Sequence, residues 1–157
     1  MSSHFKFLVL IISGILLIGA QVSDTLYGKI IGVHDGDSIT LLLDGNVQLK
    51  VRLEGIDCPE SKQAFGTKAK QFTSDLAFGH QITLHQTGKD RYSRTLGFII
   101  LPDSRNLNEE LLKAGLAWHF KKYNKDPHLA DLESMARNER RGLWKEPNPI
   151  PPWEFRK

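Results

Sequence analysis

Charged residues gather in two short segments of this chain, and a third charged segment lies further downstream. The first is 35–38, Asp-Gly-Asp-Ser, the second runs from 52 to 60, and the third from 89 to 94. Together they hold carboxylates that suit a hard metal ion, a carboxylate that can accept a proton, and two guanidinium groups that can bind a phosphate. Hydrolysis of a phosphodiester bond needs this combination, so the three segments predict that chemistry.

The candidate metal ligands come from the first two segments. Asp35 and Asp37 lie on either side of a glycine, and a tight turn alone would explain this pattern. Asp57 favours a functional interpretation, because the proline two residues later holds Cys58 in an extended conformation and lets its carbonyl point away from a strand ladder. Asp37, Asp57 and the Cys58 carbonyl would form an all-oxygen site with room for water, which favours Ca²⁺ over Mg²⁺.

Three further side chains complete the candidate catalytic set. Glu60 lies three residues after Asp57 and could orient or deprotonate a water molecule, although an acid near a helix start would also explain it. Arg52 and Arg94 come from different predicted strands, so two guanidinium groups could bind one phosphate and stabilise its transition state. Each arginine taken alone would also be explained as a solvated surface residue.

Apolar and turn patterns predict the elements that must position these residues. Alternating apolar and polar residues indicate strands at 47–53 and 81–86, and segments rich in strand-forming residues bounded by turns indicate three more, at 27–34, 38–43 and 95–101. Helical spacing indicates three helices, at 65–78, 106–115 and 126–141, with Asn106 and Asp126 as the N-caps of the second and third. The predicted fold class is α+β, mainly β: an OB-type five-stranded barrel with three helices.

The N-terminus has the features of a targeting segment. Lys6 precedes an uncharged apolar run from Phe7 to Ala20, which is short for a membrane span but suits the core of a signal peptide. We therefore expect residues 1–20 to be a signal peptide and the protein to be exported, either secreted or periplasmic. If the leader is retained, residues 5–20 would instead anchor the protein in a membrane, facing outside the cytoplasm.

The rest of the chain divides into three parts. Residues 21–26 are a polar connector, residues 27–144 hold the predicted domain, and residues 145–157 form a proline-rich tail that we expect to be extended. The chain has 157 residues, of which 40% are hydrophobic and 25% charged, as in an ordinary globular protein, and we expect a monomer. Its formal net charge of +3 permits a polyanionic partner. The single cysteine, Cys58, excludes an intramolecular disulfide and a multi-cysteine zinc site.

The order and internal spacing of the charged segments resemble the staphylococcal nuclease (thermonuclease-like) family over about residues 27–144. The segments that carry the resemblance are Val-His-Asp-Gly-Asp-Ser at 33–38, Val-Arg-Leu-Glu-Gly-Ile-Asp-Cys-Pro-Glu at 51–60 and Lys-Asp-Arg-Tyr-Ser-Arg at 89–94. Residues 108–117 and 140–144 give further support.

The resemblance implies an OB-type barrel with three helices and a Ca²⁺-dependent endonuclease that acts on DNA and RNA and leaves 3′-phosphate ends. By the same resemblance, the metal would be held by Asp37, Asp57 and the Cys58 carbonyl, and Asp35 would assist from outside the direct ligands. Glu60 would act on the attacking water. Arg52 and Arg94 would hold the phosphate.

Two features bear on metal choice and substrate binding. Cys58 stands where the best-known member of the family has threonine, and a thiol beside the metal would favour softer metals. Tyr92 matches the family and could position a nucleotide. Lys121, Lys122 and Tyr123 combine basic and aromatic side chains, which suits a platform for single-stranded nucleic acid, although a solvated loop explains them equally well.

A non-catalytic nucleic-acid-binding module of the OB type is the alternative from another functional class. Related domains inside larger eukaryotic proteins have lost their catalytic residues and bind RNA or protein. This chain keeps both arginines, both aspartates and Glu60, which a module that only binds would not require.

Overall fold

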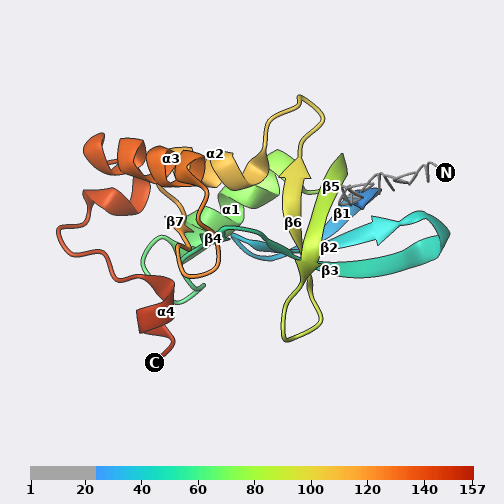
Figure 1. The fold of residues 1–157 in the computed structure, drawn as a ribbon, viewed down its shortest axis with the longest axis horizontal. Helices are drawn as coiled ribbons and strands as arrows, with labels where there is room; N and C mark the ends of the chain where they lie inside the picture. The colour runs from blue at the N-terminus through green and yellow to red at the C-terminus, as the bar shows by residue number, and fades with distance from the viewer. Residues whose placement is uncertain (1–23) are drawn as a thin grey trace, which may run out of the picture.

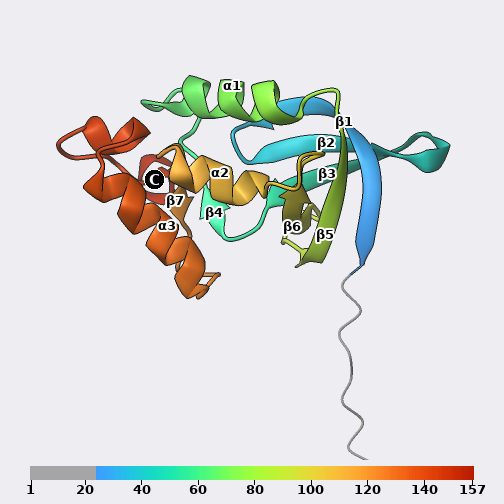
Figure 2. The same ribbon diagram turned by 90° about the horizontal axis from the view of Figure 1, so that it is seen from above.

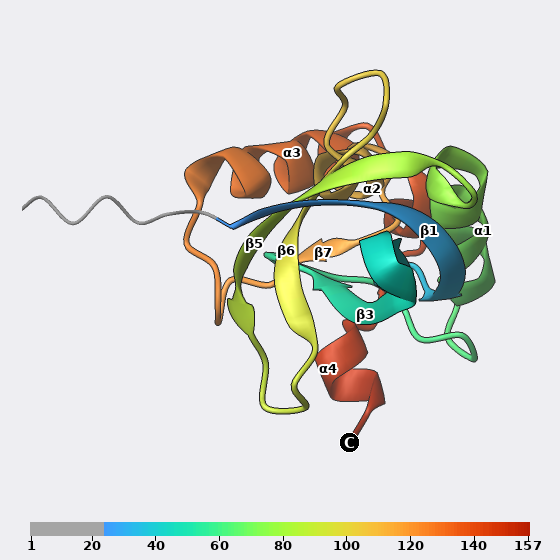
Figure 3. The ribbon, with the colours of Figure 1, turned by 90° about the vertical axis from the view of Figure 1, so that its right-hand side faces the viewer.

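A five-stranded barrel forms the centre of the computed structural model, which describes residues 24–157 (Figure 1). Its strands are β1 (Thr25–Asp35), β2 (Ser38–Leu43), β3 (Val47–Leu53), β5 (Gln81–Lys89) and β6 (Thr95–Ile100). The barrel closes in the order β1-β2-β3-β6-β5, with β3 and β6 parallel and every other pair of neighbours antiparallel. The view in Figure 3 shows the strands curving around this core. The predicted α+β fold with an OB-type barrel is confirmed.

Apolar side chains from all five strands fill the interior of the barrel. Each strand turns apolar side chains inward, and five fully buried examples, one from each strand, are Ile30, Leu41, Val51, Leu84 and Ile99. A five-stranded barrel is narrow enough for such side chains to fill it completely. The polar residues between them face outward, where Arg52 becomes available to the site.

Three helices accompany this barrel, as expected from the sequence. They are α1 (Gly66–Ala77), α2 (Leu107–Lys113) and α3 (Pro127–Asn138), and α1 lies along β1 while α2 contacts both α1 and α3 (Figure 2). The side chains of Asn106 and Asp126 each accept a hydrogen bond from the backbone N–H two residues on, so both predicted N-caps form.

Two very short strands were not expected from the sequence. β4 (Ile56–Asp57) pairs with β7 (Trp118–His119) in a separate antiparallel sheet, in which Asp57 lies opposite Trp118. Strands of two residues are too short to show an alternating pattern. Their pairing carries the segment after β7 to the side of the barrel where Asp57 lies.

The chain ends differ from the expected boundaries. Thr25 and Leu26, placed in the connector by the sequence, begin β1 and pair with β5. The predicted leader, residues 1–20, lies outside the described residues. Within residues 24–157, no helix has the length and apolar character needed to cross a membrane.

The C-terminal segment is not extended throughout, as the sequence analysis expected. After the short 3₁₀ helix η2 (Gly142–Lys145), the chain forms the one-turn helix α4 (Pro152–Phe155), close to β7 in Figure 1. Pro152 suits the first turn of a helix because its missing N–H needs no partner there, and its side chain is buried. The prolines of this segment therefore shape a docked structure.

Candidate active site

Arg52 joins the two carboxylates that were expected to hold a metal. On the outer face of the barrel, its guanidinium forms an ion pair with Asp37 through Nη1 and with Asp57 Oδ1 through Nη2, the latter at 2.8 Å. Nη2 also donates to the carbonyl of Ile56 at 3.3 Å. The β2–β3 register places Arg52 opposite Ser38, directly after Asp37. Strand pairing thus brings the first and second charged segments together.

The burial of this group shapes its electrostatics. The side chain of Arg52 is 13% exposed and that of Asp57 is 1% exposed. Burial alone would lower the pKa of Arg52, but the charges of Asp37 and Asp57 raise it well above its ordinary value. Burial raises the pKa of Asp57, and the neighbouring guanidinium groups of Arg156 and Arg52 only partly offset this. The carboxylate of Asp57 therefore depends on positive charge beside it.

The turn between β1 and β2 is locked against both α1 and the second segment. Asp37 Oδ2 accepts a hydrogen bond from the Cys58 N–H at 2.8 Å, and the Gly36 carbonyl accepts one from Thr73 Oγ1 at 2.5 Å. A Cβ on Gly36 would lie 2.8 Å from the Cβ of Ala69 and 2.8 Å from Cys58 Sγ. Glycine is therefore required here for close approach, and Asp37 is held in place from two sides.

Gly36→Ala is expected to destabilise the protein by about 1–3 kcal/mol, because the added methyl group overpacks this contact. The free energy of unfolding, measured by urea denaturation, checks this value. Gly88→Ala is the matched control, since a Cβ at Gly88 would meet no atom within 4 Å. Equal stability of the two variants would contradict the close packing of the turn.

The thiol of Cys58 lies in the hydrophobic core. The residue is 3% exposed and packs against Gly36. It belongs to the main core cluster, which also contains Ala69. Burial raises the pKa of this thiol well above its ordinary value, so it stays protonated at neutral pH. The structure thus gives the Cys58 side chain a packing role, and only its backbone remains available to the site.

Glu60 is held near Asp57 by the loop that leads into α1. Its backbone N–H donates to Gln63 Oε1 at 3.1 Å. Gly66, the first residue of α1, packs so closely on the Glu60 carbonyl that no larger residue would fit. The Glu60 side chain is 33% exposed, and its carboxylate accepts a hydrogen bond from Arg156 Nη1 at 2.6 Å. A partly exposed carboxylate beside a buried one suits proton transfer to or from water.

Arg94 brings the third charged segment to the same site. Its Nε donates to Asp90 Oδ2 at 2.7 Å and its Nη1 to Ser38 Oγ at 3.3 Å. Burial raises the pKa of Asp90, but hydrogen bonds from Arg94 and from the backbone of Tyr92 outweigh it and lower that pKa below its ordinary value. Asp90 is thus an anchor that fixes the direction of Arg94.

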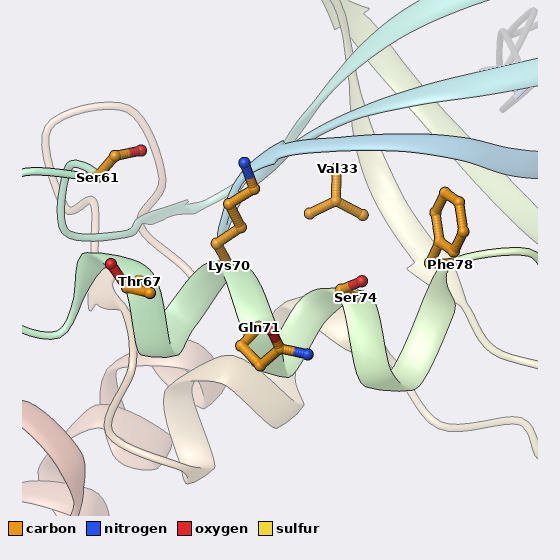
Figure 4. Close-up of a pocket in the computed structure, with 7 residues that line it drawn as sticks. All are labelled: Val33, Ser61, Thr67, Lys70, Gln71, Ser74 and Phe78. Atoms are coloured by element: carbon orange, nitrogen blue, oxygen red, sulfur yellow. The ribbon is translucent and has the colours of Figure 1, made fainter.

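Asp35 lies at the edge of the group. Its Oδ1 accepts a hydrogen bond from Ser61 Oγ at 2.7 Å. Ser61 also lines a groove between α1 and β1, in which Lys70 extends from α1 toward the strand and Phe78 closes one end (Figure 4). The other lining residues are Val33, Thr67, Gln71 and Ser74. The candidate catalytic residues do not line this groove.

The four predicted substrate-binding residues have different surroundings. Tyr92 and Tyr123 are 65% and 69% exposed, as stacking surfaces would need to be. Lys122 lies over the Tyr123 ring, 5.4 Å from its centroid. Lys121 forms an ion pair with the buried Glu133 at 3.3 Å, which gives it a structural partner. Lys121, Lys122 and Tyr123 follow β7, so the β4–β7 pairing carries them toward Asp57, whereas Tyr92 lies in the turn between β5 and β6.

The donor set fits a hard divalent cation in its chemistry. Asp37 and Asp57 share one guanidinium, and the Cys58 N–H donates to Asp37, so the two carboxylates are neighbours and the Cys58 backbone lies beside them. Within residues 24–157, no three His, Cys, Asp or Glu side chains are arranged to hold a metal ion. A cation here would therefore also need the Cys58 carbonyl and water molecules, which suits calcium.

Two residues of the C-terminal segment were missed by the sequence analysis. Arg156 forms ion pairs with both Asp57 and Glu60, and Trp153 stacks on Phe120. No periodic pattern marks a segment of this kind. A tryptophan among prolines is the one signal that could have indicated docking, because a large aromatic side chain gains most from burial.

Comparison with known proteins identifies the family. The family model described as "Staphylococcal nuclease homologue" matches residues 50–146. A protein named "Uncharacterized endonuclease" from Escherichia coli O157:H7 is 38% identical over 131 residues, covering 83% of this chain and 85% of that protein. A Haemophilus influenzae protein of the same name is 41% identical over 129 residues, covering 82% of this chain and 72% of that protein. "Micrococcal nuclease" from Shigella flexneri is 34% identical over 153 residues, with coverage of 91% and 87%.

These matches cover most of this chain and most of each relative. The chain belongs to the staphylococcal nuclease homologue family. The family resemblance inferred from the three charged segments is therefore confirmed.

Proposed function

We propose that this protein is a Ca²⁺-dependent endonuclease that hydrolyses phosphodiester bonds in DNA and RNA and leaves 3′-phosphate ends. The observation that carries the proposal is the convergence of Asp37, Asp57 and Glu60 around the guanidinium groups of Arg52 and Arg156. Membership of the family and relatives named as endonucleases or nucleases support it. A module that only binds nucleic acid would not need Glu60 beside Asp57.

Each residue has a defined part in the proposed reaction. A bound Ca²⁺ ion would be held by Asp37, Asp57 and the Cys58 carbonyl and would supply positive charge that stabilises the anionic transition state. Arg52 and Arg94 would bind the non-bridging oxygens of the phosphate. Asp35, already hydrogen-bonded to Ser61, would support the metal side of the site from outside the direct ligands.

Glu60 would accept a proton from the attacking water as the water oxygen bonds to phosphorus. The bond between phosphorus and the 5′ oxygen then breaks, and this oxygen leaves as a hydroxyl after taking a proton from solvent. The phosphate stays on the 3′ oxygen of the other fragment. Tyr92 and Tyr123, both exposed, would stack on bases beside the scissile bond.

Removal of calcium is expected to abolish cleavage. The purified protein is incubated with single- and double-stranded DNA and RNA in Ca²⁺, Mg²⁺, Mn²⁺ or EGTA, and fragments are separated by electrophoresis. We expect cleavage in Ca²⁺, loss of activity in EGTA and recovery when Ca²⁺ is added back, because the oxygen ligands suit that ion.

The product ends test the direction of cleavage. Fragments should accept a new label at the 5′ end directly, and at the 3′ end only after treatment with a phosphatase. Absence of cleavage in every metal would refute the enzymatic proposal, and activity unaffected by EGTA would refute its calcium dependence.

The proposal also includes export with removal of residues 1–20, supported by the apolar run before Ala20, and a monomeric protein. A retained leader would anchor the same activity in a membrane, facing outside the cytoplasm.

A further inference from the structure

The C-terminal segment 146–157, called the C-terminal arm below, returns to the catalytic residues. Contacts on both sides of Pro152 dock it. The Gln63 side chain donates to the carbonyl of Ile150, and Trp153 stacks on Phe120 with ring centroids 5.3 Å apart and 8° between the planes. Gln63 also accepts from the Glu60 N–H, so the arm is tied to the same loop that carries the proposed proton acceptor.

The docked arm delivers one guanidinium to two carboxylates. Arg156 Nη1 lies 2.6 Å from Glu60 Oε1 and 3.2 Å from Asp57 Oδ1, and Nη2 lies 2.7 Å from Asp57 Oδ2. The contacts at 2.6 and 2.7 Å are short charge-assisted hydrogen bonds, which are among the stronger ones in proteins. A single side chain from far along the chain therefore connects the proposed proton acceptor to a proposed metal ligand.

The two carboxylates depend on Arg156 to different degrees. Asp57 also binds Arg52 and is almost fully buried, so it keeps a partner without the arm. For the Glu60 carboxylate, Arg156 is the one side-chain partner among residues 24–157. Glu60 is partly exposed, so without Arg156 its side chain would sample other rotamers.

We propose that Arg156 is a positioning residue of the active site, which holds the Glu60 carboxylate beside Asp57 in the orientation that accepts the proton of the attacking water. This inference rests on the proposed nuclease function. A cation on Asp57 would bind the same carboxylate oxygens of Asp57 that Arg156 contacts. The hydrogen bond from Arg156 to Glu60 Oε1 does not involve those oxygens. Arg156 thus acts on the reaction through Glu60.

A double-mutant cycle tests this role. kcat and KM are measured at saturating Ca²⁺ on a short single-stranded DNA for the wild type, Arg156→Gln, Glu60→Gln and the double variant. We expect Arg156→Gln to lower kcat by about 10- to 100-fold, the scale on which small misplacements of a reacting group act, with KM within about threefold. The double variant should be no slower than Glu60→Gln alone, because both changes remove the same contribution.

Two further variants separate positioning from general effects. Arg156→Lys keeps the charge and should restore part of kcat. Lys157→Gln removes one positive charge from the same arm and should leave kcat unchanged. Calorimetric titration should show that Arg156→Gln binds Ca²⁺ no more weakly than the wild type. Weaker metal binding would then not be the cause of its lower kcat.

Three results would overturn the inference. The first is an Arg156→Gln variant with normal kcat. The second is a double variant in which the two losses multiply. The third is an Arg156→Gln variant that is faster than the wild type and binds Ca²⁺ more tightly, which would make the arm a blocking element. Failure of the proposed function is distinguishable, because the wild type itself would then cleave no substrate. Failure of the proposed role of Glu60 would instead leave Glu60→Gln as active as the wild type.

Discussion

Glu60→Gln is expected to lower kcat by about 10²- to 10⁴-fold, the range that general acid–base catalysis contributes. The amide keeps the size of the side chain and can still meet a hydrogen-bonding partner, but it cannot accept a proton at neutral pH. Because Glu60 is partly exposed and its loop is fixed by backbone contacts with Gln63 and Gly66, the fold should be retained. Steady-state cleavage of a fluorescent oligonucleotide measures the change.

Glu139→Gln is the matched control for this prediction. Glu139 is also a partly exposed carboxylate paired with an arginine, Arg141, but it lies after α3 and away from the catalytic residues. It should retain the rate and the unfolding midpoint of the wild type. A Glu60→Gln variant with a near-normal rate would show that another group takes the proton.

Arg52→Ala and Arg94→Ala are expected to lose activity together but to differ sharply in stability. Loss of Arg52 removes the charge shared by Asp37 and Asp57, and breaking a buried ion pair typically costs about 3–5 kcal/mol. Arg94 is 31% exposed and its partner Asp90 lies in a turn, so its loss should cost less than about 1 kcal/mol. Both variants remove a phosphate-binding group, which should lower kcat by about 10²- to 10³-fold.

Urea denaturation with and without Ca²⁺ checks the stability difference. A cation that binds the folded state stabilises it by mass action, and this gain should be largest for Arg52→Ala, in which the ion would replace the missing positive charge. Equal stability of Arg52→Ala and the wild type would contradict the description of Arg52 as the charge that holds the two carboxylates together.

The barrel and its helices could be predicted because their patterns are long enough to be periodic. Five strands and three helices, two of them with the expected side-chain N-caps, are present close to their expected bounds. The sequence also predicted that Arg52 lies on the polar face of β3, because apolar and polar residues alternate there. The register of the β2–β3 hairpin then brings Arg52 to Asp37. Local patterns thus account for most of the fold.

Contacts between distant parts of the chain could not be predicted in this way. The β4–β7 pair has two residues in each strand, and the ion pairs of Arg156 depend on the docking of Trp153. The direction of the Cys58 side chain was also open, because sequence alone does not show that Gly36 and Ala69 leave space for a thiol in the core. Each of these features depends on tertiary packing.

The parallel pairing of β3 with β6 has a consequence for the order of assembly. It joins Val51 to Thr95 and closes the barrel across the whole stretch that holds α1 and β5. Pairing of strands that lie far apart in the sequence forms slowly, because closing the long loop between them costs conformational entropy before the new contacts form. During synthesis from the N-terminus, the carboxylates of the site are made early, but the barrel cannot close before β6 has emerged. Arg156 follows every barrel strand, so the group that holds Glu60 is the last of the site residues to arrive.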